Sequence, residues 1–204
     1  MKTRLAIIGA SGHGKVIADI ALLNGYKEIV FFDDDLGVKK CAGFDVVGRS
    51  STVEAYKENY DIFIAIGKPK TRQKIQEKLE TAGVSVVTLI HPKAVIGCDI
   101  KIGAGTVVMA NAVINPSTNI GKGCIINTGC TVDHDNQIAD YVHISVGAHL
   151  AGTVSIGEKT WIGAGAVVSN NVKITGNCII GAGAVVVKDI LEAGTYVGVP
   201  AQLK

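Results

Sequence analysis

The sequence predicts two parts, a small α/β domain at residues 1–90 and an all-β parallel β-helix at residues 91–204. In the second part an aliphatic residue recurs at every sixth position, and in the first part strand-like and helix-like segments alternate. The composition supports an ordered chain, because 48% of the 204 residues are hydrophobic and 19% are charged. With 25 glycines but only 4 prolines, the chain is not a low-complexity linker.

The six-residue period runs from Ile90 to Val186 without a slip. It fits neither an α-helix, with a period of 3.6, nor an amphipathic strand, with a period of 2. It is typical of a parallel β-helix, in which each hexad forms one short strand and one turn. Three hexads complete a triangular coil, so residues 18 positions apart should stack, and the span holds about five coils. A small residue often precedes the aliphatic one by two positions, and three cysteines there are predicted to be buried structural thiols: Cys124, Cys130 and Cys178.

Residues 1–90 follow the pattern of a small parallel sheet with helices. Alternating β and α segments favour parallel strands. The size corresponds to about half of a dinucleotide-binding fold, that is, a Rossmann-like half domain. Strands are expected at 4–8, 28–32, 61–66 and 84–89, and helices at 15–24 and 71–82.

A glycine-rich loop, GASGHG, follows the first expected strand and opens the first helix. Its Ser11, Gly12 and His13 stand where backbone N–H groups and a helix N-terminus can bind a phosphate, although a tight turn explains the glycines equally well. Asp33 and Asp34 end the next strand and could accept hydrogen bonds from ribose hydroxyls or a base N–H, or form a solvated acidic turn. Because the domain is the size of one mononucleotide-binding half of that fold, a nucleotide sugar is favoured over NAD as its ligand.

The β-helix is a scaffold, so candidate catalytic residues are the polar ones that depart from its six-residue pattern. His134 lies between Asp133 and Asp135, an arrangement typical of a general base with an orienting carboxylate; the alternative is a surface histidine in a polar turn. Gly152 is 18 positions further on and should leave space beside the imidazole. Other polar residues gather in the same stretch: Asn127, His143, Ser145 and His149. A six-residue step separates the last two histidines and places them on different faces, so no shared metal is expected.

Charge and hydropathy exclude several function classes. The formal charge is +2 with no basic run, which argues against a nucleic-acid partner. No run of about 18 apolar residues is present, so no spanning helix is expected, and the N-terminal apolar stretch is too short for a signal peptide. The five cysteines are odd in number and lack CxxC spacing, which indicates reduced thiols. Together these features predict a cytoplasmic globular protein.

The motifs INTGCTVDHD, HISVGAHLAG, IGAGAVV and VGVPA, together with GASGHG and FFDD, resemble bacterial nucleotide-sugar acetyltransferases of the bacillosamine N-acetyltransferase type. Sialic-acid O-acetyltransferases share this two-domain plan. The resemblance implies a left-handed β-helix, a homotrimer with sites between subunits, acetyl-CoA as co-substrate and no metal. The implied reaction is N-acetylation of the 4-amino group of a UDP-linked dideoxyamino sugar. The alternatives are a sugar O-acetyltransferase, a GDP-amino-sugar N-acetyltransferase and a non-catalytic nucleotide-sugar-binding protein.

The resemblance also implies roles for individual residues. His134 maps onto the catalytic base and Asp135 onto the acidic residue that orients it, although the relatives carry Glu there and Asp133 is a substitute candidate. Asn127 maps onto a position near the reacting amine. Acetyl-CoA contacts are implied for His143, Ser145, Gly152, Ala164 and Ala182. Nucleotide-sugar contacts are implied for Ser11, Gly12, His13, Asp33, Asp34 and Gly67.

Overall fold

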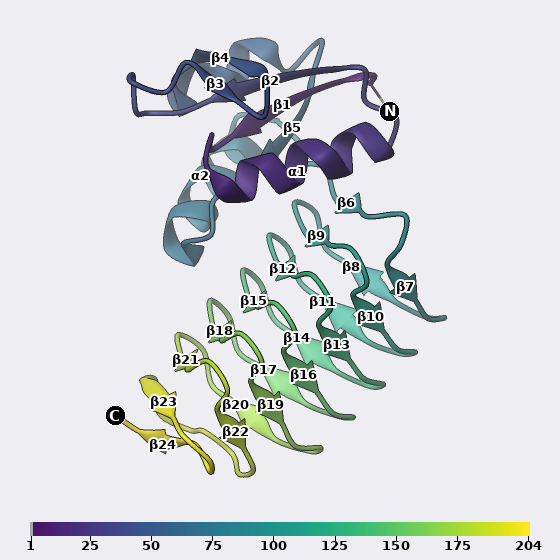
Figure 1. Ribbon diagram of the computed structural model, residues 1–204, viewed down its shortest axis with the longest axis vertical. Helices are drawn as coiled ribbons and strands as arrows, with labels where there is room; N and C mark the ends of the chain where they lie inside the picture. Colours follow the sequence, from purple (N-terminus) through teal and green to yellow (C-terminus); the bar gives the residue numbers. More distant parts are fainter. Residues whose placement is uncertain (1) are drawn as a thin grey trace. The chain divides into compact units, whose positions relative to one another are not determined.

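The computed structural model describes residues 2–204. The chain divides into two compact units, Met1–Pro92 and Lys93–Lys204. The first is an α/β unit and the second is a series of coils with short strands (Figure 1). In the described part, neither helix combines the length and the apolar character that crossing a bilayer requires.

The first unit is built on a sheet in the order β3-β4-β2-β1-β5. Its strands are β1 (Arg4–Ile8), β2 (Glu28–Phe32), β3 (Lys40–Cys41), β4 (Phe44–Gly48) and β5 (Asp61–Ile64). The remaining elements are α1 (Gly12–Leu23), the 3-10 helix η1 (Ser50–Tyr56), α2 (Pro69–Thr81) and β6 (Leu89–Ile90). β1 pairs in parallel with β2 and β5, and β2 pairs in parallel with β4. The side chains of β1 from Leu5 onward are buried, as expected for a central parallel strand covered on both faces.

The structure corrects three sequence predictions in this unit. The strand expected at 84–89 is reduced to an isolated bridge between Val86 and Ile62, followed by the two residues of β6. α1 begins at Gly12 rather than at residue 15, so it includes two glycines of the GASGHG loop. Gly14 packs against the Gly9 carbonyl, where a Cβ would collide, so this close approach requires glycine. The short strands β3 and β4 were not predicted. In β4 half-buried and exposed residues alternate, but the apolar Val47 stands at an exposed position and hides this alternation in the sequence.

The second unit is a β-helix whose two-residue strands form three parallel stacks. The first stack contains β7 (Val95–Ile96), β10 (Val113–Ile114), β13 (Thr131–Val132), β16 (His149–Leu150), β19 (Val167–Val168) and β22 (Val185–Val186). The second contains β8 (Lys101–Ile102), β11 (Asn119–Ile120), β14 (Gln137–Ile138), β17 (Ser155–Ile156) and β20 (Lys173–Ile174). The third contains β9 (Val107–Val108), β12 (Ile125–Ile126), β15 (His143–Ile144), β18 (Trp161–Ile162), β21 (Ile179–Ile180) and β23 (Thr195–Val197), to which β24 (Gln202–Leu203) adds in antiparallel.

Every parallel pair between β7 and β22 joins residues 18 positions apart, as the hexad period predicts; Ile114 pairs with Val132, for example. Figure 1 shows the coils following one another from teal through green to yellow. The recurring aliphatic residues from Val108 to Val186 are buried along the axis, whereas Ile96 is exposed and Ile90 and Ile102 are half-buried. Cys124, Cys130 and Cys178 are buried as well, which confirms their assignment as structural thiols. Burial raises the pKa of the Cys130 thiol to about 12, so this thiol is not a nucleophile at neutral pH. The predicted fold class, an α/β domain followed by a left-handed β-helix, is confirmed.

Candidate functional site

His134 lies at the corner between β13 and β14, outside the packed interior. Its Nδ1 is 2.7 Å from Oδ2 of Asp135, and both side chains are more than half exposed. Asp135 has a φ of 59°, in the left-handed region that Asp and Asn tolerate better than most residues. The hydrogen bond that Asp135 accepts from the ring raises the pKa of His134, and the negative charge of Asp133 raises it further. The imidazole is thereby made more basic, with its other nitrogen, Nε2, directed away from Asp135.

Asp133 supports the same corner in a different way. Its Oδ1 accepts a hydrogen bond from the backbone N–H of His134 at 2.8 Å and another from Nδ2 of Asn115 at 2.8 Å. These bonds, with the one from Asn115 contributing most, hold the pKa of Asp133 below its usual value. The sequence left open which aspartate contacts the imidazole. In the structure Asp135 binds the ring, while Asp133 binds the backbone.

Gly152 stacks against His134 from the next coil, as the 18-residue spacing predicts. A Cβ built at Gly152 would lie 2.6 Å from both Cε1 and Nε2 of the ring. The corner is tied to this coil by a bond from the Thr153 N–H to the His134 carbonyl at 2.9 Å. Within residues 2–204, the N–H of Gly152 donates to no acceptor. An available N–H therefore lies beside a basic imidazole.

Beneath this corner, Asn136 is fully buried and holds the backbone in place. Its Nδ2 donates to the carbonyls of Asp133 at 2.5 Å and Ala151 at 3.0 Å, and its Oδ1 accepts from the Val154 N–H at 3.0 Å. These bonds connect the corner to the following coil. Because buried polar groups need partners, the three bonds stabilise the turn that presents His134.

Replacing Asn136 by Ala should lower the free energy of unfolding by about 2–3 kcal/mol, because it leaves buried backbone groups without partners. The measurement is denaturant unfolding followed by circular dichroism. Gln137→Ala, at the exposed neighbouring position, is the matched control and should change the free energy by less than about 0.5 kcal/mol. Equal stability of the two variants would contradict the bridging role of Asn136.

A groove of about 380 Å³ runs along the first strand stack next to this corner. Asn115 and Asp133 line it together with Thr131, His149 and Val167. Nδ1 of His149 is 2.9 Å from Oγ1 of Thr131, so this histidine is engaged with a hydroxyl on the preceding coil. The groove gives the base a neighbouring surface on which a small ligand can rest.

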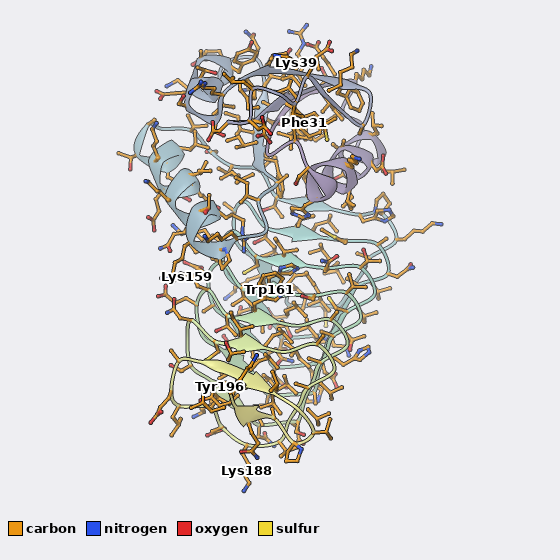
Figure 2. All side chains as sticks on the ribbon, turned by 60° about the vertical axis from the view of Figure 1, so that its left-hand side comes forward. Phe31, Lys39, Lys159, Trp161, Lys188 and Tyr196 are labelled. Carbon is orange, nitrogen blue, oxygen red and sulfur yellow. The ribbon has the colours of Figure 1, made fainter. Side chains whose placement is uncertain are left out.

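A second polar cluster, around His143, lies on the third strand stack. Nε2 of His143 is 3.1 Å from Nδ2 of Asn127, and its ring stacks on Trp161 with centroids 5.1 Å apart. Trp161, labelled on the coils in Figure 2, donates from Nε1 to Oγ of Ser145 at 2.6 Å. The cluster thus joins three predicted site residues, Asn127, His143 and Ser145, but the structure does not bring them into contact with His134 in the same chain.

The histidines of the β-helix therefore have separate partners: Asp135 for His134, Asn127 for His143 and Thr131 for His149. In the part of the chain that the structure describes, no group of three His, Cys, Asp or Glu side chains is arranged to hold a metal ion. The two alanines expected along the acetyl-CoA groove, Ala164 and Ala182, are both exposed at the turns after β18 and β21.

The glycine-rich loop of the first unit borders a cavity of about 210 Å³. Predicted residues that line it are Ser11, Asp33, Asp34 and Gly67, with Gly9, Ser50, Ala65 and Ile66 completing the wall. Gly12 begins α1, which places the helix N-terminus next to Ser11. His13 is mostly buried, and burial, with a smaller effect from the positive charge of Arg72, lowers its pKa to about 4.

The two aspartates of this cavity accept hydrogen bonds from the protein backbone. Asp33 accepts hydrogen bonds from the N–H groups of Ala10 at 2.7 Å and Asp35 at 2.9 Å. Asp34 accepts from the N–H of Ser50 at 3.0 Å. Asp33 therefore shapes the glycine-rich loop directly, while Asp34 is exposed and retains an oxygen for a ligand.

Sequence reasoning missed several residues that support these sites. Asn115 precedes Asp133 by 18 positions, so the stacking rule could have found it. Asn136 occupies an inward position that elsewhere holds small residues, and its polarity there was a usable signal. Arg72 is buried within α2, and nothing in the hydropathy of that segment indicates it.

Comparison with known proteins agrees with both units. Residues 4–79 match the family model described as the PglD N-terminal domain, and residues 153–188 match the bacterial transferase hexapeptide repeat. The acetyltransferase domain of PglB from Neisseria gonorrhoeae, solved with acetyl coenzyme A, is 40% identical with a TM-score of 0.96, and the match covers 100% of both chains. PerB from Caulobacter crescentus, solved with CoA and GDP-perosamine, is 38% identical with a TM-score of 0.93, covering 98% of this chain and 96% of that one.

Two curated relatives match over shorter stretches. UDP-N-acetylbacillosamine N-acetyltransferase of Bacillus subtilis is 35% identical over 123 residues, which is 52% of this chain and 51% of the relative. GDP-perosamine N-acetyltransferase of Escherichia coli O157:H7 is 36% identical over 81 residues, 39% of this chain and 36% of the relative. The matches thus span about half or less of these curated relatives.

A PglD-type N-terminal domain joined to a hexapeptide β-helix with a histidine–aspartate corner defines a hexapeptide-repeat transferase. The chain belongs to the bacterial sugar N-acetyltransferase family that includes the bacillosamine and perosamine enzymes, as its sequence motifs predicted.

Proposed function

We propose that this protein is an acetyl-CoA-dependent N-acetyltransferase that acts on the 4-amino group of a UDP-linked dideoxyamino sugar. The observation that carries the proposal is the corner where His134, bound to Asp135, lies against the available N–H of Gly152. Family membership supports the reaction class. Two solved structures of the perosamine N-acetyltransferase from Caulobacter crescentus are of variants in which a histidine is replaced.

In the proposed reaction the sugar amine attacks the thioester carbonyl carbon of acetyl-CoA. Because an ammonium group is not a nucleophile, the amine attacks in its neutral form, and Nε2 of His134 accepts a proton from the attacking nitrogen. The N–H of Gly152 donates to the oxyanion of the tetrahedral intermediate. The C–S bond then breaks, and the proton passes from His134 to the thiolate of CoA. Because a thioester is already activated, the remaining task is to hold amine and thioester together.

A homotrimer with sites between subunits completes the proposal. Within one chain, His134 follows the first strand stack, whereas His143 and Trp161 lie on the third. A neighbouring subunit that presents its third stack to the His134 corner would bring Asn127 and His143 toward the reacting groups. Asn127 would then act near the amine and His143 near acetyl-CoA.

The nucleotide is proposed to bind at the glycine-rich loop of the first unit. Ser11, Gly12 and Gly67 would contact the phosphates through backbone N–H groups, and Asp34 would accept from the ribose or base. A GDP-linked amino sugar is the second candidate. It is favoured by the likeness to PerB over nearly the whole chain, because that enzyme was solved with GDP-perosamine.

The test is a thiol-release assay with acetyl-CoA against UDP- and GDP-linked 4-amino sugars, with free sialic acid included. Turnover of a UDP-linked amino sugar is the expected result. Turnover confined to a GDP-linked sugar would establish the second candidate, and turnover of sialic acid alone would establish an O-acetyltransferase. Binding of nucleotide sugars without turnover of any acceptor would identify a non-catalytic binding protein.

The pH profile should depend on Asp135. Because its hydrogen bond raises the pKa of His134, and the base must be neutral, the rate should fall as pH drops through that raised value. In Asp135→Asn the pKa of His134 should return toward its ordinary value, so the acid limb of the kcat/KM profile should move to lower pH. The maximal rate should also fall about tenfold or more, because the amide no longer stabilises the protonated ring.

Asp99→Asn is the matched control, since Asp99 also has a positive φ, at the equivalent corner two coils earlier, and is exposed. It should leave the pH profile unchanged. An acid limb at the same pH in Asp135→Asn as in the unaltered protein would contradict the coupling between Asp135 and His134.

A further inference from the structure

Among residues 2–204, Arg72 is the largest of the fully buried side chains, only 1% exposed within α2. A buried guanidinium is costly unless its N–H groups are bound. Its Nη1 donates to the carbonyl of Ile66 at 2.7 Å and to that of Gly67 at 2.8 Å. The side chain therefore ties the turn between β5 and α2 to the helix that follows it.

The two hydrogen bonds to Arg72 use the carbonyl groups of the turn and leave its backbone N–H groups available to a ligand. With two carbonyls bound to Arg72, the N–H groups of Ile66, Gly67 and Lys68 donate to no acceptor anywhere in residues 2–204. Pro69 opens α2 and has no N–H, so the helix N-terminus directly follows these donors. Ile66 and Gly67 line the 210 Å³ cavity. One wall of the cavity is thus rich in donors and lies at the positive end of a helix.

The glycine-rich loop contributes to the same cavity. Ser11 lines the cavity just before the N-terminus of α1. Nε2 of His13, one residue into that helix, is buried and has no hydrogen-bond partner. Burial and the nearby charge of Arg72 lower the pKa of this imidazole and keep it neutral at pH 7. The cavity therefore lies at the N-termini of both α1 and α2, where unbonded backbone N–H groups favour a phosphate group. Its two carboxylates, Asp33 and Asp34, already accept hydrogen bonds from backbone N–H groups.

We propose that Arg72 is a positioning residue for the diphosphate of the nucleotide sugar, fixing the 66–68 turn so that its N–H groups are available to phosphate oxygens. The inference rests on the proposed function, because it assumes that the cavity receives a nucleotide. Arg72 acts through the turn rather than by contact with the reacting atoms. It should therefore affect binding of the nucleotide and leave acetyl-CoA and the transfer step unchanged.

The variants are Arg72→Met, which keeps a long apolar side chain, and Arg72→Lys, which keeps the charge and a donor. Lys78→Met removes a charge from the exposed last turn of the same helix and is the control. Calorimetry measures the Kd of UDP and GDP, and steady-state kinetics measures KM for both substrates and kcat. We expect at least a tenfold higher Kd and nucleotide-sugar KM for Arg72→Met and a smaller increase for Arg72→Lys. KM for acetyl-CoA and kcat should stay within threefold, and Lys78→Met should match the unaltered protein.

Amide hydrogen exchange on the unaltered protein provides a second measurement that does not depend on the variants folding. Addition of UDP or GDP should slow exchange at residues 66–68. No slowing there, or a Kd for Arg72→Met within twofold of the unaltered value, overturns the role of Arg72 and leaves the proposed function in place. Failure of the unaltered protein to bind either nucleotide overturns both.

Discussion

Replacing His134 by Ala should reduce kcat by about 100-fold to 10,000-fold, the usual contribution of a positioned general base. KM for acetyl-CoA and for the nucleotide sugar should change little, because the imidazole acts on the proton released during attack. The fold should be unaffected, since the side chain is 57% exposed and its hydrogen-bond partner, Asp135, is equally exposed. Thiol release under saturating conditions measures the effect.

The matched control for this variant is Asn170→Ala. Asn170 occupies the same corner two coils further along, is exposed, and makes no side-chain hydrogen bond within residues 2–204. Its replacement should leave kcat within twofold. Turnover by His134→Ala at more than a tenth of the unaltered rate would remove His134 from the role of base, whatever the acceptor.

The β-helix could be predicted almost residue by residue because its period is set by geometry. An aliphatic side chain every six residues and pairing at a distance of 18 leave one arrangement of inward and outward positions. The same rule places Gly152 against His134 and Trp161 against His143 from the sequence alone. Local sequence determines the contacts of this unit, because each coil touches only its neighbours.

The α/β unit was harder to predict for the opposite reason. Its strands pair at unequal distances along the sequence, for example Phe31 with Val46 and Leu5 with Asp61, so no single period predicts them. Arg72 illustrates the limit: a basic residue in a polar helix reads as solvent-exposed, yet its guanidinium is buried because two backbone carbonyls of a turn face it. Contacts between a side chain and distant backbone follow from the tertiary fold and produce no periodic pattern in the sequence.

The two aspartates beside His134 show how similar residues acquire different roles from backbone geometry. Asp135 occupies a left-handed corner position, with its carboxylate on the imidazole. Asp133 precedes the corner and binds Asn115 and a backbone N–H instead. A carboxylate held in this way stays ionised and fixes the corner. Removing Asp133 should therefore disturb the position of the base as well as lower its pKa, whereas removing Asp135, whose hydrogen bond has the larger effect on that pKa, should act mainly on the pKa.

Gly152→Ala should lower kcat by about 10-fold to 100-fold with the fold intact. The new Cβ would lie 2.6 Å from the imidazole, so the ring must turn away from its place beside the Gly152 N–H. A displacement of about 1 Å of a reacting group can cost about 100-fold in rate. Unfolding free energy should change by less than about 1 kcal/mol, because the residue has no positive φ and the Cβ would be nearest to an exposed ring that can move.

Because alanine keeps the backbone N–H, this substitution separates the position of the base from the presence of the oxyanion donor. In the His134→Ala background there is no ring to displace, so adding Gly152→Ala should reduce the residual rate by less than threefold. A large further loss in the double variant would show that the methyl group obstructs the thioester itself. Unchanged kcat in the single variant would show that the ring acts from another position, and the proposed contact between base and donor would have to be abandoned.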